Sequence, residues 1–344
     1  MLKKIFIIIL GIVLSSCIQR IYQVDNANLS DGKYDSEFPS QNCSKQIKEI
    51  SESVKMLNCM VIYRTYFFSR NDSIRENEIE KAIKANKMIN ETFDHEPVSG
   101  TATIISTENN KIVLLTCAHI IDFPDRLVTK FTEEDRSEQY IQSVAYKQNM
   151  NIYINDIPNG NKLEIIAVDN EKDIALLGTD LGLHDDFIPV FNYKIGKARE
   201  LEWGCFLYIM GYPLGNKMIT SGIVSDPDGI KHGSFIIDAL FNKGFSGGLV
   251  FAIRDGIPNF ELVGIAKSVS AEHRYELIPE KEQHEFVYNP RIPYEGALLV
   301  RTGEDINYGI TYAIPIEEIV EFIKYKRPTI TQKGYNLDKF LKKN

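Results

Sequence analysis

The chain has 344 residues, with 39 Lys and Arg against 47 Asp and Glu, and a formal net charge of -8 at pH 7. This acidic balance, without a cluster of Lys and Arg, argues against a protein that binds the phosphate backbone of nucleic acids. The 44% of hydrophobic residues is enough to bury a core. The length fits two modest domains or one large β-rich unit.

The first residues have the pattern of an export signal. Two lysines precede the apolar run Ile5 to Leu14, which is too short for a transmembrane helix of about 20 residues and has the length of a signal-peptide core. The sequence LSSC that ends at Cys17 resembles the lipobox of bacterial lipoproteins. That resemblance implies a lipoprotein signal peptide over residues 1–16, lipidation of Cys17, and a membrane-anchored place in the bacterial cell envelope, facing the periplasm or the exterior. An ordinary signal peptide with a chance cysteine is the alternative.

The composition changes along the next part of the chain. Residues 17–45 are polar and rich in Asn, Ser, Asp and Gly, which is typical of a flexible tether. Strand-forming residues become dense from Val54 onward, and this density predicts the start of the folded body. Between about 70 and 94, a capping-box spacing and a weak apolar stripe predict a solvated helical insertion.

From Gly100 onward, short apolar segments alternate with turn residues. Many short strands of even spacing indicate a β-barrel or sandwich, so the fold class expected is all-β. The last element is a helix over 316–326 with one apolar face, and Pro328 is expected to help end it. Residues 329–344 are predicted to form a basic, loosely held tail.

Four cysteines remain after Cys17: Cys43, Cys59, Cys117 and Cys205. An exported location permits disulfides, and four cysteines allow three full pairings, with free buried thiols as the alternative. None of the cysteines has CxxC spacing. His273 and His284 lack an HExxH arrangement, so neither a metal nor a cofactor is expected.

Three segments contain the residue types that nucleophilic catalysis needs. KIVLLTCAHII includes His119, NEKDIALL places Asp173 before an apolar strand, and NKGFSGGLV places Ser246 among glycines. A serine hydroxyl needs an imidazole that takes its proton, and a carboxylate fixes the tautomer of that imidazole. Glycines permit the tight turn that aims backbone N–H groups at the oxyanion.

Each of these motifs is weak alone, because a single histidine or aspartate beside a strand is usually structural. Their order and separation are more informative. The gaps are 173 − 119 = 54 and 246 − 173 = 73 residues. Each gap accommodates several strands, as a site between two barrels requires.

TCAHII, DIALL and GFSGG resemble the His, Asp and Ser motifs of the trypsin-like (chymotrypsin-fold) serine proteases, in that family's order. Further segments over roughly 50–326 resemble the bacterial HtrA/Deg branch: GYPLG, TSGIVS, DALFNKGFSGG, ELVGIA and YAIPIEEIV. The resemblance implies two six-stranded antiparallel β-barrels, with a helical insertion near the N-terminus and a C-terminal helix. It places a protease domain over 46–328, and the PDZ modules of typical HtrA proteins are not expected.

Residue by residue, the resemblance implies Ser246 as the nucleophile, His119 as the general base and Asp173 as its orienting carboxylate. The backbone N–H groups of Gly244 and Ser246 would form the oxyanion hole. Leu240 would lie near the base of the primary specificity pocket and favour a small or medium aliphatic side chain.

The strand from Gly264 through Ala266 to Ser268 would pair with the substrate backbone. Two positions depart from the family pattern: Phe245 replaces Asp or Asn, and Leu249 replaces Pro. The bulky Phe245 could hold the oxyanion loop in a non-productive shape.

Two functions are therefore considered. The first is a serine endopeptidase that hydrolyses exported or envelope proteins through an acyl-enzyme intermediate, with polypeptides as substrates. The alternative is a non-catalytic peptide-binding lipoprotein on the same fold. The presence of all three triad residues favours the enzyme, because a retired protease commonly loses one of them. The oligomeric state is open.

Overall fold

The computed structural model of the chain describes residues 30–39, 41–131, 140–157, 162–183, 186–229, 233–279, 291 and 298–343. The predicted signal peptide, Cys17 and the first part of the predicted tether lie outside these residues. So does His284.

The first half of the described chain forms one antiparallel sheet in the order β4-β5-β1-β2-β3-β7-β6. Its strands are β1 (Val54–Phe68), β2 (Met88–Glu108), β3 (Lys111–Thr116), β4 (Arg126–Lys130), β5 (Ile141–Ile154), β6 (Glu164–Asp169) and β7 (Ile174–Asp180). The apolar positions of β3 and β7 are almost all buried. Buried runs of this kind indicate that both faces of these two strands are covered by other parts of the protein.

The second half forms a sheet in the order β12-β9-β10-β11-β14-β13-β8, and the additional pairing of β12 with β13 closes six of these strands into a barrel. Its strands are β8 (Lys194–Ile195), β9 (Phe206–Gly211), β10 (Met218–Asp226), β11 (Phe235–Ile237), β12 (Leu249–Ile253), β13 (Phe260–Pro279) and β14 (Leu298–Pro315). The all-β, trypsin-like double-barrel arrangement that the motifs imply is thereby confirmed, with one difference. The first sheet is not closed by any pairing of its two edge strands within the described residues.

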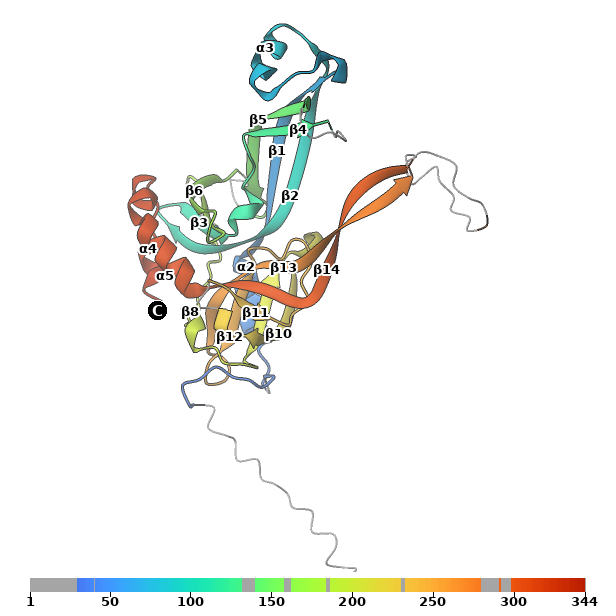
Figure 1. Cartoon of the computed structure of the whole chain (residues 1–344). Helices are drawn as coiled ribbons and strands as arrows, with labels where there is room; N and C mark the ends of the chain where they lie inside the picture. The colour runs from blue at the N-terminus through green and yellow to red at the C-terminus, as the bar shows by residue number, and fades with distance from the viewer. Residues whose placement is uncertain are drawn as a thin grey trace, which may run out of the picture.

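Two projections leave the body (Figure 1). The outer parts of β1 and β2, together with β4, β5 and α3 (Ile79–Lys84), form a tower with its own apolar cluster. The helical pieces of the predicted insertion are η2 (Arg70–Asp72), η3 (Glu76–Glu78) and α3. Helical structure ends at Lys84, whereas residues 88–94 belong to β2 and pair with β1. These residues form a strand and not a helix because they pair with the long neighbouring strand β1.

The described part of the predicted tether is attached to the second barrel. The Asp35 N–H donates to the Ile253 carbonyl (2.9 Å), and the Asp35 carbonyl accepts from the Phe206 N–H (2.9 Å). The buried Tyr34 hydroxyl donates to Glu261 at 2.8 Å, and the Arg254 guanidinium lies 3.9 Å from the centre of the Tyr34 ring. The prediction of a flexible tether over 17–45 is wrong for this part, because one aromatic side chain and a strand-like contact fix it. Helix α2 (Ser44–Ser53) follows.

The C-terminal tail is also folded. Helix α4 (Ile316–Gln332) continues through the exposed Pro328, and a short helix α5 (Asp338–Leu341) follows. Both the expected end at Pro328 and the loosely held tail are therefore wrong. Apolar side chains decide the outcome, because residues beyond the proline are buried in the main core: Ile330, Tyr335, Leu337 and Phe340.

All four described cysteines are buried and free, so the question of disulfide pairing is answered by free thiols. Among the described residues, no helix is both long and apolar enough to cross a bilayer.

Replacing Phe340 by Ala is expected to lower the free energy of unfolding by about 3–5 kcal/mol, because this fully buried ring would leave a cavity. The matched control is Tyr325→Ala in α4, whose side chain is exposed; it should change stability by less than about 0.5 kcal/mol. Denaturant unfolding followed by circular dichroism measures both. Equal effects of the two substitutions would mean that the tail contributes nothing to the core.

Candidate active site

A cleft of about 1200 Å³ lies between the two barrels and contains the residues of all three sequence motifs. The first barrel contributes His119 and Asp173, and the second contributes the loop around Ser246. The other lining residues used below are Tyr212, Leu214, Phe241, Lys243, Gly244, Lys267 and Ser268.

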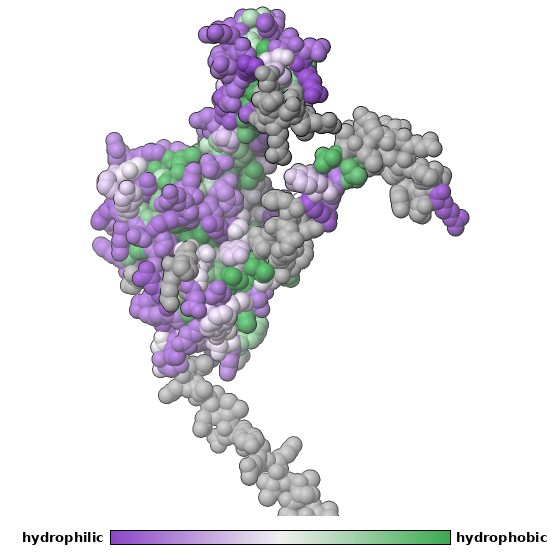
Figure 2. Space-filling model, viewed as in Figure 1, coloured by the Kyte–Doolittle hydropathy of each residue, from purple (hydrophilic) through white to green (hydrophobic). Residues whose placement is uncertain are grey.

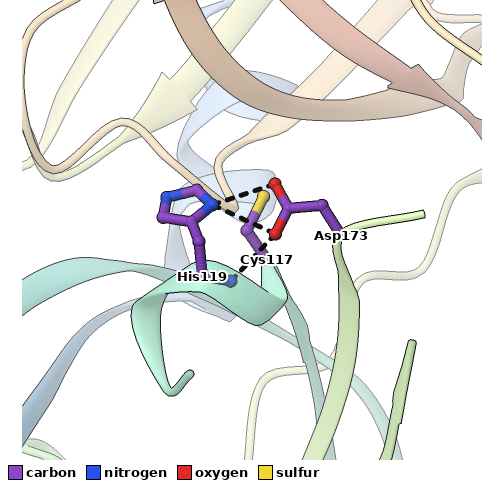
Figure 3. Close-up of side chains that lie close together, drawn as sticks. All are labelled: Cys117, His119 and Asp173. Atoms are coloured by element: carbon purple, nitrogen blue, oxygen red, sulfur yellow. Dashed lines mark hydrogen bonds and ion pairs between the residues drawn. The ribbon is translucent and has the colours of Figure 1, made fainter. Parts of the chain in front are cut away.

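The side chains of His119 and Asp173 contact one another directly (Figure 3). His119 lies in the turn η4 (Ala118–Ile120) after β3, and Asp173 immediately precedes β7. The His119 Nδ1 atom is 2.9 Å from Asp173 Oδ2 and 3.1 Å from Oδ1. The His119 backbone N–H also donates to Oδ1 at 2.8 Å. The carboxylate therefore fixes both the turn and the ring.

This contact determines the tautomer of the imidazole. An ionised carboxylate only accepts hydrogen bonds, so Nδ1 carries the proton and Nε2 has a free lone pair. The Asp173 side chain is 9% exposed and that of His119 is 44% exposed. Asp173 also has a left-handed backbone, with φ of 60°, a conformation that costs energy outside glycine. The His119 ring is thus held by a buried carboxylate at Nδ1, while the ring itself remains accessible from the cleft.

Cys117 lies beside this pair, and one ligand atom from each of the three residues falls within 4.8 Å of the others. The thiol is fully buried and donates to the Ala266 carbonyl at 3.4 Å. Burial raises the pKa of the Cys117 thiol well above its usual value, whereas a metal ligand or nucleophile needs the thiolate. The Cys117 thiol is therefore a poor candidate for a nucleophile beside the His–Asp pair.

Two glycines allow the turn that contains Ser246. Gly247 has φ of 80°, and a Cβ there would lie 2.1 Å from the Thr101 carbonyl oxygen. Gly244 has φ of 104°, and a Cβ there would lie 2.3 Å from the Tyr212 carbonyl oxygen. Any other residue would clash and be strained at these positions. The loop is thus pressed closely against backbone from both barrels.

The Ser246 hydroxyl donates to the Lys267 carbonyl at 3.1 Å. Within the described residues it makes no hydrogen bond to His119. The structure therefore brings the three predicted triad residues into one cleft and forms the His–Asp contact, but not the Ser–His contact. Catalytic hydrogen bonds are often long or absent without substrate.

The peptide planes of the loop are fixed by their carbonyl groups. The Lys243 carbonyl accepts from the Leu214 N–H at 2.9 Å, and the Phe245 carbonyl accepts from the Gly248 N–H at 2.7 Å. In a trans peptide the N–H points away from the carbonyl, so the N–H groups of Gly244 and Ser246 point away from these contacts. Neither donates to another described residue. Two anchored and unused donors beside a serine suit an oxyanion hole.

Phe245 is part of this arrangement. Its side chain is 2% exposed and packs against Phe241, with ring centres 5.8 Å apart. The N–H of Phe245 closes the turn by donating to the Asn242 carbonyl at 3.1 Å. The substitution of an apolar residue for the family's Asp or Asn therefore anchors the loop through the core of the second barrel.

Thr101 of β2 connects the loop to the first barrel and was not identified from the sequence. Its N–H donates to the Ser246 carbonyl at 2.8 Å, and its buried hydroxyl donates to the Gly244 carbonyl at 2.7 Å. The same hydroxyl accepts from the Tyr212 N–H at 2.8 Å. No sequence pattern points to this role, because it depends on the contact between two barrels.

The prediction for Leu240 is wrong. Its side chain is 62% exposed and does not line the cleft, whereas the neighbouring Phe241 is buried and does line it. In this extended segment, alternate residues face inward: Ala239 and Phe241 are buried and Leu240 lies between them. An apolar pocket wall is retained, but a different residue supplies it.

The predicted substrate-pairing strand is only partly available. Gly264 pairs with Val250 of β12 and with β14, and Ala266 exchanges hydrogen bonds with Gly247 and Gly248. Both edges are therefore occupied there. Ser268 does line the cleft. Lys267 lies in a register shift between β13 and β14, and such a bulge re-aims its carbonyl toward Ser246.

Comparison with known proteins places these motifs in one family. The model of the family described as "Trypsin-like peptidase domain" matches residues 100–265, which include His119, Asp173 and Ser246. A protein named "Serine protease HtrA-like" from Staphylococcus haemolyticus (strain JCSC1435) is 28% identical over 183 residues. That match covers 42% of this chain and 28% of the length of the relative. The part of the chain that matches, residues 100–265, is therefore similar to a trypsin-like peptidase domain, and the double-barrel fold agrees with this match.

Proposed function

We propose that this protein is a serine endopeptidase with Ser246 as the nucleophile, His119 as the general base and Asp173 as the residue that orients His119. One observation carries the proposal. A histidine with a fixed tautomer lies in the same cleft as a serine that is flanked by two anchored, unused N–H donors. These are the components that acyl transfer requires.

In the proposed reaction, the Ser246 hydroxyl turns from the Lys267 carbonyl toward His119 Nε2. Nε2 takes the proton while Oγ bonds to the carbonyl carbon of the substrate, and the N–H groups of Gly244 and Ser246 bind the resulting oxyanion. The intermediate collapses to an acyl-enzyme as the leaving amine takes the proton from His119. Water then attacks the carbonyl carbon of the ester while Nε2 takes a proton from it. The second intermediate collapses as His119 returns this proton to Ser246 Oγ, and the acid is released.

The location is also a proposal, which rests on the residues before the described part of the chain. The lipobox-like segment ending at Cys17 supports lipid anchoring in the bacterial cell envelope, where exported polypeptides would be the substrates. Radiolabelled palmitate incorporated by the wild-type chain and absent from Cys17→Ser would support this anchor. Equal incorporation in both would contradict it.

A fluorophosphonate probe should label the wild-type chain at Ser246 and should label neither Ser246→Ala nor His119→Ala. The probe reacts only with a serine that an adjacent base activates. Gel fluorescence and peptide mass mapping measure the reaction. A folded wild-type chain that takes no label would favour the alternative, a peptide-binding protein without turnover, in which the Ser246–Lys267 hydrogen bond persists.

Asp173→Asn should lower kcat by about 10³–10⁴-fold, because an amide no longer selects the tautomer that leaves Nε2 free. Steady-state hydrolysis of a peptide that the wild-type chain cleaves measures the loss. A loss below about tenfold would mean that Asp173 acts only on the turn around His119 and not on its ring.

Thr101→Val should lower kcat by about 10–100-fold with little change in KM, because the loss of the hydroxyl frees the Gly244 carbonyl and loosens the oxyanion loop. Thr101→Ser keeps the hydroxyl and should restore most of the activity. Thr101 is a positioning residue, since it does not line the cleft. Equal activity of the Val and Ser variants would show that only the packing of the side chain matters.

A further inference from the structure

Beyond the second barrel, β13 and β14 continue as a two-stranded ribbon, which we call the arm: residues 267–279 of β13 and 298–311 of β14 (Figure 1). At about 3.3 Å per residue, the β13 side of the arm extends roughly 40 Å from the cleft. Within the described residues, the arm pairs with no other strand along most of this length.

The outer edge of β13 is free along the arm. Strand β12 pairs with β13 only as far as Ile265, and Ala266 completes this edge by its hydrogen bonds to Gly247 and Gly248. From Lys267 onward, within the described residues, β14 occupies one edge of β13 and no strand occupies the other. Unpaired N–H and C=O groups along an edge are a template for a further strand.

The free edge begins inside the cleft. The Lys267 carbonyl is the acceptor of the Ser246 hydroxyl, and Ser268 lines the cleft next to it. A chain paired with this edge would therefore pass directly over the serine. The edge of β13 and the proposed site of cleavage form one continuous surface.

The two faces of the arm differ in character. Tyr275, Leu277 and Val300 lie on one face by strand alternation and register, and they are 82%, 67% and 67% exposed. The opposite face carries ion pairs of Glu276 with Arg274 (2.6 Å) and Arg301 (2.8 Å). Figure 2 shows apolar side chains on the arm that stand clear of the body. The apolar face covers no core of its own.

We propose that the arm binds the part of a polypeptide substrate that precedes the scissile bond, as an added β-strand with apolar side chains on one face. This proposal rests on the proposed function and names its substrate class: long, extended polypeptides rather than short peptides. The added strand takes the line of β12 and runs antiparallel to β13, so its outer part is the N-terminal part.

The register gives the position of the apolar contacts. Tyr275 and Leu277 lie 275 − 267 = 8 and 277 − 267 = 10 residues beyond Lys267. The substrate residues that meet them are therefore about eight to ten positions before the scissile bond, since antiparallel partners keep the same spacing. Apolar residues at alternate positions in this region bury against the arm.

A second copy of this chain is a poorer occupant of the same edge. A strand from another arm paired along residues 267–279 would extend over Ser246 and close the cleft. The net charge of -8 per chain also opposes the close approach of two copies. An unfolded substrate meets neither obstacle.

Binding can be measured separately from turnover in the full chain carrying Ser246→Ala. Three fluorescein-labelled peptides share one centre of about eight residues, with Val before and Ala after the central bond. The first peptide consists of this centre alone. The second peptide has about twelve residues of alternating Val and Ser before the centre, and the third has the same residues after it. Fluorescence anisotropy should give a Kd for the second peptide at least about tenfold below the other two, because only an N-terminal extension reaches the arm.

The triple substitution Tyr275→Thr, Leu277→Thr and Val300→Thr keeps β-forming residues and should remove most of this tenfold difference. Arg301→Thr, on the charged face beside Val300, is the matched control and should retain it. Near-UV circular dichroism checks that each variant is folded.

Equal affinities for the three peptides would overturn the proposal. It would also be overturned if Arg301→Thr lost the tenfold difference in Kd as fully as the triple substitution does. A dimer by sedimentation that the triple substitution dissociates, with no preference among the peptides, would assign the face to a second copy and also overturn it. Fluorophosphonate labelling decides the proposed function independently. Tight binding of the N-extended peptide without labelling would support substrate binding by the arm and refute the endopeptidase function. Labelling without a preference for this peptide would support the endopeptidase function and refute substrate binding by the arm.

Discussion

The geometry of the cleft depends on the hydrogen bonds between β2 of the first barrel and the serine loop of the second. Thr101 makes two of these bonds, from its N–H to the Ser246 carbonyl and from its hydroxyl to the Gly244 carbonyl. Its hydroxyl also accepts from the N–H of Tyr212, which follows β9 of the second barrel. Its own carbonyl accepts from the hydroxyl of Thr116, at the end of β3 and three residues before His119. The strand that leads to the base is thus connected through buried bonds to the loop that holds the nucleophile. Breaking such a connection leaves buried polar groups unpaired, which costs about 1–3 kcal/mol for each group.

The family substitution at Phe245 follows from the same connection. An acidic or amide side chain there would need a buried partner, whereas a phenyl ring needs only packing. Phe245 packs on Phe241, whose side chain also lines the cleft. The apolar wall of the cleft and the anchor of the oxyanion loop are therefore parts of one aromatic pair. A substitution in the wall that alters substrate preference would therefore also change the packing of the oxyanion loop.

The sequence predicted the parts of the site that depend on local chemistry. Strand-then-turn motifs around His119, Asp173 and Ser246 were enough, because each turn is set by its own residues, such as the glycine at 247 that alone fits the approach to Thr101. Leu240 was misassigned because counting from the serine does not reveal which of two alternating residues faces inward. Thr101 and the Lys267 carbonyl were missed because their roles arise from contacts between segments far apart in sequence.

The two misjudged ends of the chain have a common cause. Polar or basic composition indicated a free segment at each end, but a few apolar side chains outweighed it: Tyr34 at one end and Phe340 at the other. Burying one aromatic side chain contributes about 1.5–3 kcal/mol, which fixes a short segment whose remaining residues are solvated. Average composition therefore predicts poorly where two or three large residues decide the outcome.

The attached N-terminal segment fixes the point at which the chain reaches the body. The residues around Tyr34 lie on the second barrel at the end away from the tower (Figure 1). With the proposed anchor at Cys17, the tower and the arm would thus be held away from the membrane. An exposed strand edge beside an apolar face normally invites association between identical chains. Here the acidic net charge of each chain disfavours the pairing of identical arms, and leaves the edge open to a chain of different sequence that enters the cleft.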